Sequence, residues 1–135
     1  MSAQAQVVAL GDLDLWFYGS RVRIDFEDLA NFSDAETDRL RFRLWASEDP
    51  WETYDRGEVI SIGLLPRLQA NQNLSDFHRT VHVHRPDDTG WYYLTLTIEE
   101  RTFDENGQKR WHIHDVIEFD GLKFFRRSSW FPFPF

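Results

Sequence analysis

Hydrophobic and polar residues alternate along much of this chain with a period of two. In RVRIDF, residues 21–26, Val22, Ile24 and Phe26 alternate with charged residues, and RLRFRLWA, residues 39–46, repeats the pattern. Such alternation is typical of strands with one buried and one solvated face. The pattern and its turn signals predict an all-β antiparallel sandwich of seven or eight strands. The further strands are expected near 13–18, 58–65, 77–84, 91–100, 109–119 and 122–127.

The clearest local unit is a hairpin over residues 91–119. WYYLTLTIEE and KRWHIHDVIEF flank the stretch DENG, in which Asn106-Gly107 suits a turn with positive φ. Helix is scarce, because only residues 33–36 (SDAE) and 64–71 (LLPRLQAN) have the capping or proline signals of one helical turn.

Three stretches contain sequence features beyond the alternation of apolar and polar residues. They are LANFSDAETDRLRFRLWAS, LLPRLQANQ and DDTGWYYLTLTIEE. Over roughly residues 20–100 they resemble the bacterial cell-adhesion-related Ig-like domains (CARDB-type), a family of fibronectin-III-like sandwiches. The chain departs from the family at Asn71, where Gly is usual. The resemblance implies an Ig-like or fibronectin-III-like fold and an adhesive or scaffolding role, with no catalytic residues. The matching features are Asn31, Ala46-Ser47, Leu65-x-x-Leu68-x-Ala70 and Gly90-Trp-Tyr-Tyr93.

Composition narrows the classes of function. Apolar residues make up 41% and aromatic residues 16% of the 135 residues, which supports a well-packed domain. The absence of cysteine excludes disulfides and thiolate chemistry. A net charge of −8 argues against nucleic acid as a partner, because its binding needs a basic surface. The acidic residues all precede Gly121, whereas three basic residues follow it, and this asymmetry indicates a partner or a surface.

Two His-x-His pairs, VHVH at 81–84 and WHIH at 111–114, are the main candidates for chemistry. On a strand, His112 and His114 share one face, and Glu118 continues it. Two imidazoles and a carboxylate are ligands that suit Zn²⁺ or another divalent cation. Solvent-facing histidines are the favoured interpretation, so no cofactor is expected, and a metal at these three residues is the alternative.

Three carboxylates in the hairpin raise separate questions. Asp115 is the only polar residue on the face expected to be buried between Trp111 and Phe119. Because a buried unpaired carboxylate is costly, a β-bulge near 114–115 or a partner such as an arginine is expected there. Glu99 and Glu100 are adjacent on a strand, so they are expected to point to opposite faces and not to act as a paired acid and base.

The segment SSWFPFPF, residues 128–135, is expected to form an extended arm beyond a sandwich domain of residues 1–127. Proline fixes φ and lacks an N–H, so the segment is preset as extended, with one pairing edge blocked. Docking on a protein partner or a second copy is expected. Packing on its own domain and insertion at a membrane interface stay open. The expected contact residues are Trp130, Phe131, Phe133, Phe135, Arg126 and Arg127.

These features predict a protein that binds and scaffolds, as an accessory subunit of a larger assembly. No nucleophile elbow, phosphate loop or nucleotide fingerprint points to an enzyme. Carbohydrate binding through Trp45, Trp51 or Trp91 is a further alternative. No apolar run is long enough to span a bilayer. The expected location is the cytoplasm if Met1 is the natural start, and the periplasm or cell surface if the chain has been trimmed.

Overall fold

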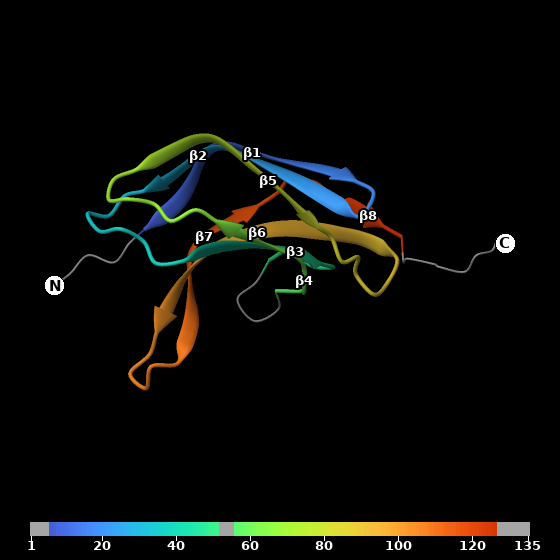
Figure 1. The fold of residues 1–135 in the computed structure, drawn as a ribbon. Helices are drawn as coiled ribbons and strands as arrows, with labels where there is room; N and C mark the ends of the chain where they lie inside the picture. Colours follow the sequence, from blue (N-terminus) through green and yellow to red (C-terminus); the bar gives the residue numbers. More distant parts are fainter. Residues whose placement is uncertain (1–5, 52–55, 127–135) are drawn as a thin grey trace.

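Two antiparallel β-sheets pack face to face in the computed structural model (Figure 1). The structure describes residues 6–51 and 56–126. One sheet has the order β1-β2-β5, and the other β4-β3-β6-β7, with β8 pairing to the start of β6. The predicted all-β sandwich is confirmed, and the described residues contain no helix, hence none that could cross a membrane. The strands are β1 (Val7–Tyr18), β2 (Arg21–Asn31), β3 (Leu40–Ser47), β4 (Glu58–Leu65), β5 (Asn73–His82), β6 (Gly90–Phe103), β7 (Lys109–Glu118) and β8 (Lys123–Phe125).

The core lies between the two sheets, where alternate residues of each strand turn inward. Ile24 of β2 and Phe42 of β3 are fully buried. Phe26 and Phe42 meet across the two layers, with ring centroids 6.4 Å apart. Gly63 of β4 leaves room for the Phe42 ring, because a Cβ there would lie 2.3 Å from Phe42 Cε2. The alternating polar residues face outward, as a period of two requires.

The edges of the two sheets are linked on both sides of the sandwich. On one side, the His84 N–H donates to the Ile60 carbonyl and the Ser61 hydroxyl to the His82 carbonyl, both at 2.8 Å. On the other side, the Ala9 N–H of β1 donates to Asp115 Oδ2 of β7 at 3.0 Å. These bonds use polar groups that edge strands otherwise offer to other chains.

The β6–β7 hairpin forms as predicted and projects from the body of the sandwich (Figure 1). Gly107 has a φ of 76°, and its N–H donates to the Asp104 carbonyl at 2.9 Å. The helical turns predicted at 33–36 and 64–71 are wrong. The Thr37 N–H donates to the Leu68 carbonyl, and the Leu68 N–H to the Thr37 hydroxyl, both at 2.9 Å. The two loops therefore satisfy each other's backbone groups across the end of the sandwich.

Two strands begin earlier than predicted, because irregular backbone interrupts their alternation. β1 starts at Val7, and its pairing with β2 shifts register between Leu10 and Leu13. β5 starts at Asn73 and contains Asp76 with a φ of 54°. Each irregularity moves the following side chains out of the simple two-residue pattern.

Candidate functional site

The two histidine pairs lie in different sheets. His82 ends β5 of the three-stranded sheet, whereas His112 and His114 belong to β7 of the five-stranded sheet. His82 and His84 are exposed, and their ring centroids are 4.8 Å apart. The four imidazoles therefore do not form one site.

β7 contains a bulge at His114, as predicted for residues 114–115. Ile98 pairs with Asp115 and Glu99 with Ile113, which leaves His114 as the extra residue. Its side chain is 4% exposed, and its Nε2 lies 2.7 Å from Glu100 Oε1. The bulge thus turns one histidine of the pair into the structure and leaves its neighbour in solvent.

The alternative metal site at His112, His114 and Glu118 does not form. A strand rises about 3.3 Å per residue, so Glu118 lies roughly 13 Å along β7 from His114, too far to share one ion. His112 is exposed, while Nε2 of His114 is engaged by Glu100. Among residues 6–51 and 56–126, no three His, Asp or Glu side chains are grouped to hold a metal ion.

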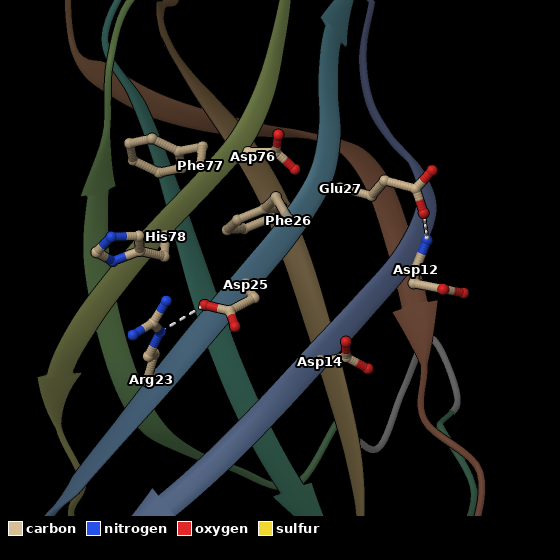
Figure 2. A pocket seen from close by; sticks show the side chains of 9 residues that line it. All are labelled: Asp12, Asp14, Arg23, Asp25, Phe26, Glu27, Asp76, Phe77 and His78. Atoms are coloured by element: carbon tan, nitrogen blue, oxygen red, sulfur yellow. Dashed lines mark hydrogen bonds and ion pairs between the residues drawn. The ribbon is translucent and has the colours of Figure 1, made fainter.

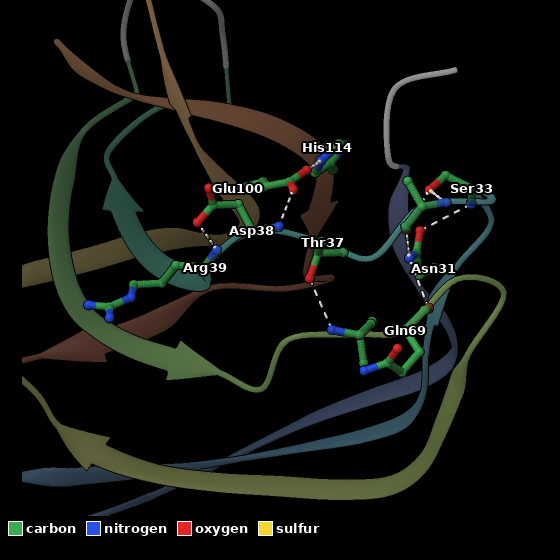
Figure 3. Close-up of polar contacts among 10 residues, drawn as sticks. Asn31, Ser33, Thr37, Asp38, Arg39, Gln69, Glu100 and His114 are labelled. Carbon is green, nitrogen blue, oxygen red and sulfur yellow. Dashed lines mark hydrogen bonds and ion pairs between the residues drawn. The ribbon is translucent and has the colours of Figure 1, made fainter. Parts of the chain in front are cut away.

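A polar network connects His114 to the loop between β2 and β3 (Figure 3). Glu100 Oε2 accepts from the Asp38 N–H at 2.6 Å, and Asp38 Oδ1 accepts from Arg101 Nη2 at 2.9 Å. The Arg39 backbone N–H and then the Arg101 guanidinium hold the pKa of Asp38 below its ordinary value of 3.8, against the opposing effect of burial. These carboxylates already have partners, so the network orients the loop.

Guanidinium and indole groups cover the outer face of the five-stranded sheet. Glu99 is fully buried there, although it points away from the core. Its Oε1 lies 2.8 Å from Arg41 Nη2, and its Oε2 lies 2.6 Å from Arg43 Nε. Glu100 points to the other face, as predicted. We call this group the Arg–Trp cluster: Arg41, Arg43, Trp45, Thr97, Glu99 and Trp111.

Stacking and hydrogen bonds hold the Arg–Trp cluster in place. The Arg41 guanidinium carbon lies 3.9 Å from the centre of the Trp111 ring, and that of Arg43 lies 4.4 Å from the Trp45 ring. Trp45 Nε1–H donates to the Thr97 hydroxyl at 3.0 Å, and that hydroxyl donates to Glu99 Oε2 at 2.7 Å. The buried carboxylate is therefore charge-balanced and fully hydrogen-bonded, which is the condition for burying it.

The tryptophans considered for sugar stacking differ in exposure. Trp45 is 8% exposed, with Arg43 over its ring and Trp51 against it at 5.4 Å between centroids. Trp91 is 60% exposed and lies beside Phe124, with ring centroids 5.2 Å apart. Trp45 is therefore not an open platform, and Trp91 is the most exposed of the three.

The outer face of the three-stranded sheet carries an acidic depression of about 300 Å³ (Figure 2). Asp14 lies directly opposite Asp25 in the pairing of β1 with β2, an arrangement in which like charges repel. Arg23 Nε lies 2.7 Å from Asp25 Oδ1, which offsets part of this repulsion. The two outer faces therefore differ in charge. The carboxylates of the depression are Asp12, Asp14, Asp25, Glu27 and Asp76.

β8 anchors the end of the sandwich from which residues 127–135 continue. Phe125 is 6% exposed and contacts Phe17 and Tyr92 edge to face, at 5.8 and 6.0 Å between centroids. A groove of about 360 Å³ lies between the β1–β2 turn and β8, and we call it the tail-end groove. At its rim, Arg85 Nη1 donates to the Arg126 carbonyl at 3.0 Å. The large apolar side chains exposed near this end are Tyr18, Trp91, Leu122 and Phe124.

Most of the predicted contact residues cannot be placed in this geometry. Arg126 is described, is exposed and lines the tail-end groove. The others, Arg127, Trp130, Phe131, Phe133 and Phe135, lie outside the described residues.

Sequence reasoning missed the Arg–Trp cluster. A local signal existed, because Arg41, Arg43 and Trp45 alternate along one strand and so share its outer face. Their partners Glu99 and Trp111 belong to β6 and β7, and nothing local predicts that β6 lies between β3 and β7. Comparison with family models, curated proteins and solved structures gives no match to this chain. The proposals below therefore rest on the contacts, exposure and charges of the residues described above.

Proposed function

We propose that this chain is a non-catalytic binding module, an accessory or scaffolding subunit that docks in a larger assembly partly through residues 128–135. An adhesive role, implied by the resemblance to cell-adhesion-related domains, is one form of this function. The partner is a protein or a second copy of the chain.

The observation that carries the proposal is the apolar, cationic end of the sandwich at β8. Trp91 and Phe124 pack together there while remaining 60% and 40% exposed. Arg85, Lys123 and Arg126 line or border the adjoining groove. Exposed aromatic and arginine side chains of this kind are enriched at protein interfaces.

The position of Arg126 also supports a role for the arm. Phe125 is buried in the core, and the Arg126 carbonyl is held by Arg85, so the point from which the arm continues is fixed. Residues 128–135 then supply Trp130 and three phenylalanines in a proline-restricted sequence. A restricted segment loses less conformational entropy when it docks than a flexible one.

The test compares the full chain with a chain ending at Arg127, by light scattering and by capture of partners from the native cell. The truncated chain is expected to keep its circular dichroism spectrum and melting temperature and to lose its associations. A full-length variant with Phe131, Phe133 and Phe135 replaced by Ser is the matched control, and it is expected to behave like the truncated chain. Unchanged size and partners would overturn the proposal, as would unfolding of the truncated domain, which would assign the arm to its own core.

A further inference from the structure

The outer face of the five-stranded sheet has exposed aliphatic side chains beside the Arg–Trp cluster. Ile62 and Leu64 of β4 are 54% and 57% exposed. They lie directly opposite Arg43 and Arg41 in the pairing of β3 with β4. Residues directly opposite in an antiparallel pair share a face, so aliphatic and guanidinium groups lie side by side. The side chains of the Arg–Trp cluster therefore leave Ile62 and Leu64 uncovered.

The two arginines of this face already have partners within the chain. Each guanidinium is held on two sides, by Glu99 in its plane and by an indole against its flat surface. The Arg41 and Arg43 side chains are only 18% and 21% exposed. Side chains that are already ordered lose little entropy on binding, and buried Trp and Arg groups are the usual energetic centres of interfaces.

The charge of the Arg–Trp cluster favours an acidic partner. Two guanidinium groups share one carboxylate, so the cluster carries an excess of one positive charge in a chain whose net charge is −8. Arg43 contacts Glu99 through Nε. Its terminal amino groups are hydrogen-bond donors that suit carboxylate or carbonyl acceptors of a partner. A second copy docking through the same face would bring arginines against arginines, which disfavours self-association there.

We propose that the face formed by Ile62, Leu64 and the Arg–Trp cluster docks a segment of a partner protein that presents apolar and acidic side chains together on one of its own faces. The apolar side chains would cover Ile62 and Leu64, and the carboxylates would bond the arginines. This inference deepens the proposed function and names a second contact surface, separate from the arm. A neutral sugar is disfavoured, because Arg43 and Arg41 already lie over the indole rings of Trp45 and Trp111.

The test uses the full chain and synthetic peptides of about ten residues, the length of a strand. One set carries Leu or Phe and Glu in turn at every second residue, with Thr between them, so that both kinds of side chain lie on one face of the extended peptide. A matched set has Lys in place of Glu. The acidic peptides are expected to bind at least about tenfold more tightly than the basic ones, with an affinity that falls as salt is added. Binding is also expected to shift the indole N–H signals of Trp45 and Trp111 in the nuclear magnetic resonance spectrum.

Two variants locate the surface. Ile62→Ser with Leu64→Ser is expected to weaken acidic-peptide binding by about tenfold or more. Trp16→Ser, which removes a side chain 58% exposed on the other sheet, is the matched control and is expected to leave binding unchanged. Equal binding of the two peptide sets, binding of neither, or an equal response to a neutral oligosaccharide would overturn the inference.

The arm truncation separates this inference from the proposed function. Peptide binding that survives deletion of residues 128–135 would support the face as an independent surface. Arm-dependent association with no peptide binding would overturn the inference about the face alone, whereas peptide binding with no arm-dependent association would overturn the proposed docking through residues 128–135 and leave the face.

Discussion

Glu99 shows how a single residue departs from the expectation of its pattern. Alternation places it on the solvated face, yet its side chain is fully buried beneath Arg41 and Arg43. The carboxylate is stable there because two guanidinium groups and the Thr97 hydroxyl replace its water. Removing its charge leaves two partly buried cations without their counterion.

Replacing Glu99 with Gln is therefore expected to destabilise the fold by about 2–4 kcal/mol. This is somewhat less than the roughly 3–5 kcal/mol for breaking a buried ion pair, because the arginines keep some access to water. Urea unfolding followed by fluorescence measures the loss. Glu118→Gln, an exposed residue of β7, is the control and is expected to change stability by no more than about 0.5 kcal/mol. Equal stability of Glu99→Gln and the wild type would show that the ion pair contributes nothing.

Asp38 gives a pH dependence with a defined sign. Its pKa is lowered in the folded state, so the folded protein favours the ionised carboxylate more than the unfolded chain does. The stabilisation is therefore fully present above the ordinary value of 3.8 and disappears as the pH falls through the lower, folded-state pKa.

Melting temperatures of the wild type and Asp38→Asn, measured from neutral pH down to about pH 2, test this. The wild type is expected to melt higher above pH 3.8, and the difference is expected to vanish in stronger acid. Asp34→Asn, in the same loop and exposed, is the control and is expected to match the wild type throughout. A difference in melting temperature that persists at the lowest pH would show that the substitution acts through the shape of the side chain and not through its charge.

At the scale of the element, β7 is the strand whose irregularity was predictable. Asp115 interrupted an otherwise apolar face, and a bulge was the relief expected for it. The structure has that bulge at His114, and Asp115 accepts the Ala9 N–H from the neighbouring sheet. The polar residue on the apolar face thus predicted the backbone irregularity, whereas its bond to the neighbouring sheet is seen only in the structure.

The pairing of β3 with β4 depends on a residue without a side chain. Gly63→Ala would place a Cβ 2.3 Å from the fully buried ring of Phe42, which has little room to move. The expected loss is about 1–3 kcal/mol, typical of overpacking a core. Chemical denaturation measures it. Gly90→Ala, where the nearest atom to the added Cβ is 3.9 Å away, is the matched control and is expected to lose no stability.

At the scale of the whole molecule, the sandwich presents two unlike faces and one distinct end. The three-stranded sheet carries the acidic depression, the five-stranded sheet carries the Arg–Trp cluster, and β8 forms the aromatic end. A partner can therefore approach only some surfaces without charge repulsion. This division agrees with the proposed docking of the chain in one orientation.

The topology also predicts how fast the chain folds. β2 pairs with β5, and β3 pairs with β6, so the central pairings join residues distant in the sequence. Closing such loops is slow, and folding in milliseconds to seconds is expected. Stopped-flow tryptophan fluorescence and circular dichroism are expected to report the same rate, as in two-state folding. Folding in microseconds would contradict the assigned strand order.

The sequence by itself determined the all-β class, the positions of the strands except for the early starts of β1 and β5, the DENG turn and the bulge, because alternation and turn preference are properties of neighbouring residues. The two helical turns predicted from it are wrong, because backbone groups of the two loops bond to each other, through Thr37 and Leu68, and not within a turn. It offered a metal site at His112, His114 and Glu118 that the bulge and the rise of the strand prevent.

Only the tertiary structure decided which strands are neighbours, and with that the Arg–Trp cluster. Alternation assigns a side chain to a face of its own strand, but it carries no information about the strand alongside. Glu99 and Trp111 meet Arg41 only because β6 lies between β3 and β7. That order is selected by the burial of the whole core, which no short stretch of the chain encodes.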